Sequence, residues 1–145
     1  MFNRLLESLG TISTKDDAVQ VLEPETQLAT AILLFAVIQA DSSYAASESR
    51  AFYEGLRHIF GLSEDRCWKL MSRAVSQYHK EPSLVAPATL LKHRLSMAFR
   101  RLVLVTAKRI AMSDGYLHAY EADVLARLET LLDLRDAEDV QSASA

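Results

Sequence analysis

The chain has 145 residues, of which 50% are hydrophobic, and contains few glycines or prolines. This is enough sequence for one domain, residues 1–145, that buries about 70% of its unfolded surface. The single cysteine, Cys67, excludes an internal disulfide, and the formal net charge of −3 gives no reason to expect nucleic acid as a partner. Because the N-terminus lacks the long apolar stretch and cleavage site of a secretory signal, we expect a cytoplasmic protein.

The first predicted helix carries its apolar residues at helical spacing, at Phe2, Leu5, Leu6 and Leu9, and ends at Gly10. The next begins near Pro24 and runs to Ala40 with apolar residues on nearly every face. A helix with no polar side belongs at the centre of a bundle. Its most apolar stretch, residues 28–38, is well short of the ~20 residues that cross a bilayer, so we expect no transmembrane segment.

The following two helices are predicted to form a hairpin. An apolar stripe (Phe52, Leu56, Ile59, Phe60) stops at Gly61, and Ser63 is a suitable N-cap for the next stripe (Cys67, Leu70, Met71, Ala74, Val75, Tyr78). Cys67 lies on the buried stripe, which favours a core position over a nucleophile. Trp68 lies beside that stripe, where it is either half-covered by the bundle or an anchor for a partner.

The second half of the chain begins after a break that contains Pro82 and Pro87. A helix is predicted from about Pro87 through residue 112, with an interruption near Ser96. A last amphipathic helix carries the clearest stripe (Val124, Leu125, Leu128, Leu131, Leu132), and residues 136–145 are expected to fray. No segment alternates like a strand, so the prediction is an all-α bundle of about seven helices.

Basic and acidic residues are segregated in this second half. Residues 92–109 hold six basic residues and no acidic one, whereas residues 110–145 hold eight acidic residues and only Arg127 and Arg135 as basic ones. The split indicates either that the two segments pack side by side or that they make a surface dipole that recruits a partner. Helices adjacent in sequence usually pack together, which favours the first interpretation.

The two halves of the chain also align with each other. Asp41 matches Asp114, Tyr44 matches Leu117 and Glu48 matches Glu121; after a shift of one residue, Leu56, Ile59 and Leu62 match Leu128, Leu131 and Leu134. Each match lies between a buried helix and an amphipathic helix. The pattern predicts two helical hairpins related by a pseudo-twofold axis.

The segment "SDGYLHAYE", residues 113–121, has a purely structural interpretation. Gly115 can take the left-handed position that ends the preceding helix, and Leu117 can pack the next helix onto the core. Glu121 follows His118 by three residues, the spacing at which a capping-box glutamate accepts the unpaired N–H of the N-cap residue. Asp114 is then expected to accept N–H groups of the turn.

A second interpretation is a divalent-cation site. Four carboxylates occupy equivalent places in the two copies, Asp41, Glu48, Asp114 and Glu121, and their oxygens are the hard ligands that Ca²⁺ or Mg²⁺ requires. His118 would either add a nitrogen ligand or face water. The chain has neither the DxDxDG calcium loop nor a His/Cys cluster at zinc spacing. Because the motif is short, capping alone is the favoured interpretation and capping with a cation stays open.

The duplicated motif resembles the TerB-like family, named for a bacterial tellurite-resistance protein. The shared pattern is Asp-Gly-x-apolar-x-x-x-Glu after an apolar helix that ends in Ala or Ser. It covers residues 26–135 and is strongest in the second copy, since Ser42 stands where the family has glycine. The resemblance implies acidic, divalent-metal sites and modules that serve stress-response or membrane-associated assemblies.

From these features we expect a non-enzymatic cytoplasmic module that binds a protein partner and is tuned by a divalent cation. No phosphate loop, G-x-S-x-G or His-Glu-x-x-His motif is present in the sequence. Two alternatives from other classes are kept. One is a metal-dependent hydrolase that uses the same four carboxylates, and the other is a purely structural homodimer.

Overall fold

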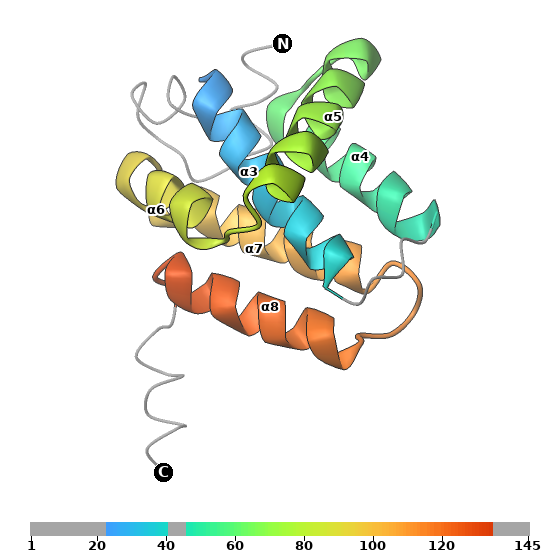
Figure 1. Ribbon diagram of the computed structural model, residues 1–145, viewed down its shortest axis with the longest axis vertical. Helices are drawn as coiled ribbons and strands as arrows, with labels where there is room; N and C mark the ends of the chain where they lie inside the picture. Colours follow the sequence, from blue (N-terminus) through green and yellow to red (C-terminus); the bar gives the residue numbers. More distant parts are fainter. Residues whose placement is uncertain (1–22, 41–45, 135–145) are drawn as a thin grey trace.

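A computed structural model describes residues 23–40 and 46–134, which form six helices and no strand (Figure 1). The helices are α3 (Pro24–Gln39), α4 (Ala46–Phe60), α5 (Glu64–Lys80), α6 (Val85–Arg94), α7 (Met97–Ala111) and α8 (Ala119–Leu131). The all-α prediction is therefore confirmed. The predicted helix over residues 2–9 and the predicted fraying of residues 136–145 lie outside the described residues.

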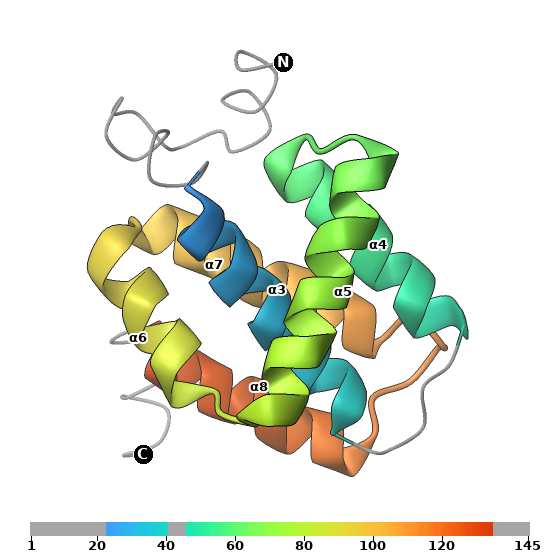
Figure 2. The ribbon, with the colours of Figure 1, turned by 45° about the horizontal axis from the view of Figure 1, so that its top comes forward.

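Helix α3 lies at the centre of the bundle, as its composition predicts. It begins at Pro24, which occupies the first helical turn where its missing N–H costs nothing. Every residue from Ala29 to Ile38 is buried. All five other helices contact α3, so each of its faces meets apolar side chains (Figures 1 and 2). No helix among residues 23–40 and 46–134 is long and apolar enough to cross a membrane.

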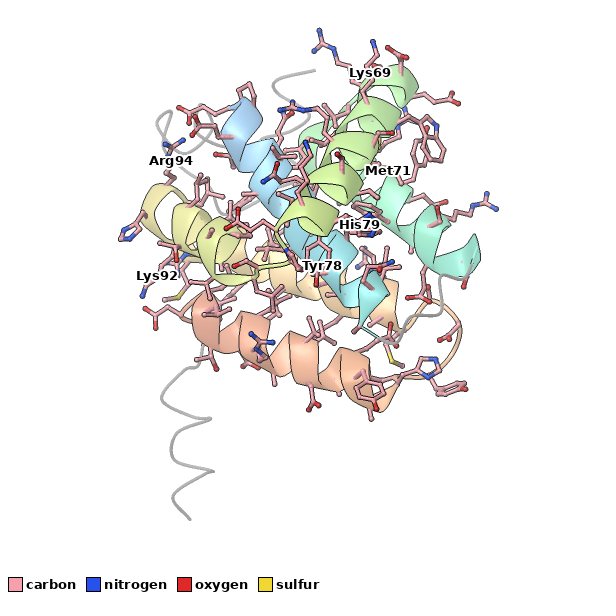
Figure 3. The ribbon with its side chains drawn as sticks, in the orientation of Figure 1. Lys69, Met71, Tyr78, His79, Lys92 and Arg94 are labelled. Atoms are coloured by element: carbon pink, nitrogen blue, oxygen red, sulfur yellow. The ribbon has the colours of Figure 1, made fainter. Side chains whose placement is uncertain are left out.

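The ring of Phe35 joins α3 to the α4–α5 hairpin. It stacks on Phe52 of α4 with ring centroids 6.2 Å apart, and it meets Tyr78 and His79 of α5 edge-on at 5.7 and 5.8 Å. Figure 3 shows Tyr78 and His79 at the end of α5 that lies over α3. Such aromatic pairs add about 0.5–1.5 kcal/mol each beyond the burial of their area.

The turn between α4 and α5 follows the sequence prediction. Gly61 ends α4 with a φ of 64°, and its N–H donates to the carbonyl of Arg57 at 2.8 Å. Ser63 then caps α5, because its Oγ accepts the N–H of Arg66 at 3.3 Å. Both residues act where the sequence placed them.

The junction of α6 and α7 is set by Ser96. Leu95 is extended, and the Oγ of Ser96 accepts the N–H of Phe99 at 3.2 Å, so a new helix starts at Met97. The predicted interruption is thus confirmed. The start of α6 at Val85, rather than near Pro87, is a small correction, since proline fits within a first helical turn.

Helices α7 and α8 pack side by side, which confirms one part of the charge argument (Figure 1). Within the described residues no ion pair joins the two helices, and the acidic residues Asp136, Glu138 and Asp139 lie outside them, so the pairing of the two segments stays a prediction. Arg100 instead donates to the carbonyl of Leu132. Arg94 turns to the start of α3, where its Nη1 lies 3.1 Å from Glu23 and 2.8 Å from Glu25.

Helix boundaries repeat along the chain in the way the alignment predicts. Helices α3 and α7 begin at residues 24 and 97, and α4 and α8 begin at 46 and 119, so both pairs are offset by 73. After α4 and α8 the backbone turns left-handed at Gly61 (φ 64°) and Asp133 (φ 57°), which are offset by 72. These positions agree with the aligned halves, while the pseudo-twofold axis itself stays a prediction.

Gly55 provides a stability test of the α4–α7 contact. A Cβ at this position would lie 2.8 Å from Cγ2 of Thr106, a short, buried and β-branched side chain. We expect Gly55→Ala to destabilise the protein by about 1–3 kcal/mol through overpacking. In a Thr106→Ser background the clash is gone, and the same change should stabilise by up to about 1 kcal/mol because alanine favours helix.

Urea unfolding of the four proteins of this cycle measures both effects. Thr106→Ser is a matched background because it removes Cγ2 and keeps the hydroxyl that donates to the carbonyl of Leu102 at 2.8 Å. An equal effect of Gly55→Ala in both backgrounds would contradict the packing described here.

Candidate functional site

At the corner between α7 and α8, the end of α7 differs from the prediction. Helix α7 ends at Ala111 with Met112 as its C-cap, so Gly115 is not the residue that terminates the helix. A further turn intervenes, in which the N–H of Gly115 donates to the carbonyl of Met112 at 3.0 Å. Gly115 does have a positive φ, 107°, as predicted, but it uses this conformation to direct the chain toward α8.

Asp114 organises this corner through both of its oxygens. Its Oδ1 accepts the N–H of Tyr116 at 3.3 Å, and its Oδ2 lies 2.9 Å from Nε2 of His118. The hydrogen bond from His118 and then that from the backbone of Tyr116 lower the pKa of the Asp114 carboxyl. Asp114 is therefore ionised at neutral pH.

Glu121 accepts the backbone N–H that the sequence assigns to it. Its Oε1 accepts from the N–H of His118, the N-cap residue, at 3.3 Å, which confirms the predicted capping contact. Glu121 is also fully buried, with 0% of its surface exposed. Capping glutamates act at helix ends without such burial, so the sequence pattern did not require it.

Glu48 occupies the corresponding place in the first half. It is the third residue of α4, as Glu121 is of α8, and only 1% of its surface is exposed. The ends of α3 and α7 and the starts of α4 and α8 lie at the same end of the bundle (Figures 1 and 2). Asp41, the fourth predicted ligand, lies outside the described residues.

The described carboxylates do not form a complete set of metal ligands. In residues 23–40 and 46–134, no three His, Cys, Asp or Glu side chains gather closely enough to hold an ion. The structure brings Asp114, His118 and Glu121 into one hydrogen-bonded corner, and it buries Glu48 at the same end of the bundle. The donor set consists of hard oxygen ligands and one imidazole, which fits a divalent cation in its chemistry.

His118, expected either to bind an ion or to face water, is partly buried in the turn. Its side chain is 28% exposed, contacts Asp114, and packs against the ring of Tyr116 with centroids 4.5 Å apart. The spacing of Asp114 and His118 alone could not reveal this contact. It depends on the turn that the Asp114 side chain makes with the backbone of Tyr116.

Large hydrophobic side chains are exposed around this corner. Eight such residues are exposed in the described chain, and four of them lie within residues 112–120: Met112, Tyr116, Leu117 and Tyr120. Leu117, expected to pack onto the core, is 41% exposed and only borders a shallow groove with Leu125. Clustered exposed apolar side chains are typical of interaction sites.

Two other candidate residues have structural positions. Cys67 is fully buried, which confirms the core prediction, and burial raises the pKa of its thiol to about 11, with a smaller opposing effect from Arg57. Trp68 is 49% exposed and stacks on Tyr53 at 5.0 Å, so the bundle covers about half of it. A buried thiol with so high a pKa is not a reactive nucleophile.

Comparison with known protein families shows the family to which the chain belongs. Residues 27–144 match the model of the family described as "Tellurite resistance protein TerB". The chain belongs to the TerB family. This agrees with the resemblance of the duplicated acidic motif, and the matched region contains all six described helices except the start of α3. No curated protein and no solved structure matches the chain.

The turn between α7 and α8 with Asp114, His118 and Glu121 is called the acidic corner below, and the conformation of Gly115 gives a testable prediction for it. A Cβ at this position would meet no atom within 4 Å, so any cost of Gly115→Ala comes from the backbone at φ 107°. We expect a loss of about 1–2 kcal/mol in the free energy of unfolding, measured in urea. Unchanged stability would show that the corner takes a different conformation in solution.

Proposed function

We propose that this TerB domain is a non-enzymatic helical module that binds a divalent cation at its acidic corner and docks a protein partner there. Asp114 and Glu121 are the favoured ligands, with Glu48 and Asp41 as their equivalents from the first half. The observation that carries the proposal is the burial of Glu48 and Glu121, both at the third position of helices that begin 73 residues apart.

The physical argument is the cost of a buried carboxylate. Moving an ionised carboxylate from water into a protein interior costs several kcal/mol unless hydrogen bonds or opposite charge compensate it. The helix N-terminus and the N–H of His118 supply part of this compensation for Glu121. A divalent cation bound at this end of the bundle would add opposite charge beside both glutamates.

Partner binding is supported by the surface around the same corner. Met112, Tyr116, Leu117 and Tyr120 surround Asp114 in sequence and are all exposed. Tyrosine is enriched among the residues that dominate binding energy at protein interfaces. A cation that fixes the Asp114 turn would also fix the position of these side chains. We therefore propose cation-dependent docking of a stress-response partner in the cytoplasm.

Thermal unfolding of metal-stripped protein tests the cation directly. Ca²⁺, Mg²⁺ or Zn²⁺ at 100 times its dissociation constant should add about 2.7 kcal/mol, a shift of several degrees in Tm. We expect this shift to vanish in Asp114→Asn, Glu121→Gln. The amide at 121 keeps an oxygen that can accept the N–H of His118, so the variant removes charge and retains the cap.

The matched control is Asp123→Asn, Glu64→Gln, which neutralises one exposed aspartate and one exposed glutamate near helix starts. It should keep the full response to the ion. No response in the native protein, or an equal response in both double variants, would reject the cation site. An affinity capture from native lysate that recovers no partner with either ion or chelator would reject the docking role.

A further inference from the structure

An apolar groove lies between α3, α5 and α6. Figure 2 shows α6 on the side of the bundle opposite to the turn between α7 and α8. Its volume is about 360 Å³, and its walls are formed by Leu28, Ala29 and Ile32 of α3 and by Ala86, Pro87 and Leu90 of α6. Gln77 and Glu81 close it at the α5 side. Leu28 lines the groove and is only partly buried.

The sequence contains an apolar face that needs such a surface. Phe2, Leu5, Leu6 and Leu9 share one side of a predicted helix, with Asn3, Arg4, Glu7 and Ser8 on the other side. A helix this short is unstable in water unless its apolar face packs against something. The TerB match starts at residue 27, so this segment precedes the unit that the family shares.

We propose that residues 2–9 dock as an amphipathic helix in the groove between α3 and α6 of their own chain. The linker from Gly10 to Glu23 can span up to about 40 Å, whereas the groove ends about 14 Å along α3 from its start. The tether holds the segment at a millimolar effective concentration, so weak docking is enough to keep the groove filled.

Charge at the rim fits this occupant. Glu81 is exposed at the α5 edge of the groove, and Arg4 stands on the polar side of the segment. Glu25 also lines the groove, near the start of α3, and it shares Arg94 with Glu23, so one arginine faces two carboxylates there. Both rims of the groove are therefore acidic, which suits an apolar face that is flanked by Arg4. Docking in this way closes the remaining uncovered part of α3.

A nitroxide spin label on the full chain tests this placement by NMR. Ala86→Cys puts the label on the exposed wall of the groove, and the native Cys67 does not react because it is buried with a thiol pKa near 11. We expect the amide signals of residues 2–9 to lose most of their intensity. With the label on Asp123→Cys, at the start of α8 and far from α6 in Figures 1 and 2, they should stay sharp.

Matched variants test whether any broadening comes from docking of the apolar face in the groove or only from a flexible segment that passes near the label. Leu5→Asn, Leu9→Asn should restore the signals and lower Tm, whereas Glu7→Asn, Ser8→Asn, on the polar side, should change neither. Sharp signals in the Ala86-labelled protein, or equal broadening from both labels, would overturn the proposal. A further control mixes spin-labelled protein without isotope label with isotope-labelled protein without spin label. If the signals of residues 2–9 broaden only in this mixture, the groove is filled by a second copy of the chain and the proposal is overturned.

Discussion

The need to cover α3 on every side determines the arrangement of this bundle. Its residues from Ala29 to Ile38 are all buried, and each of the five other described helices contacts it. Each Å² of apolar surface removed from water contributes about 25 cal/mol to folding, so this continuous buried stretch is a large stabilising contribution. The last turn of α3 lies at the same end of the bundle as the turn between α7 and α8, and its first half borders the groove, where Leu28 is only partly buried.

The two glutamates at this end of the bundle, Glu48 and Glu121, differ from ordinary capping residues because their side chains are buried. A capping box needs one carboxylate oxygen at the N-cap, and Glu121 supplies it to His118. The burial of both Glu48 and Glu121 exceeds this need. Asp114, whose hydrogen bonds lower its pKa, holds the adjoining turn in place and stays charged. The burial of Glu48 and Glu121 close to this turn is the observation on which the proposed cation site rests.

Much of this fold could be predicted from local signals. Pro24, Gly61, Ser63 and Ser96 begin or end helices through their own backbone or side-chain chemistry, so the sequence places them without knowledge of the rest. The partner of Arg94 could not be predicted, because Glu23 and Glu25 are far from it in sequence and only the packed fold brings them together. The burial of Glu48 and Glu121 could not be predicted either, because it depends on neighbouring helices. The contact of His118 with Asp114 could not be predicted because it depends on the conformation of the turn between them.

The most direct test of the acidic corner is a carbon-13 NMR titration that follows individual side-chain carboxyls as Ca²⁺ or Mg²⁺ is added. The account predicts that Asp114, Glu48 and Glu121 shift together and saturate at one ratio of ion to protein. The exposed carboxyls of Glu54 and Glu64 should stay unchanged over the same range. Shifts confined to exposed carboxyls, or Glu48 and Glu121 that do not respond at any ion concentration, would contradict it.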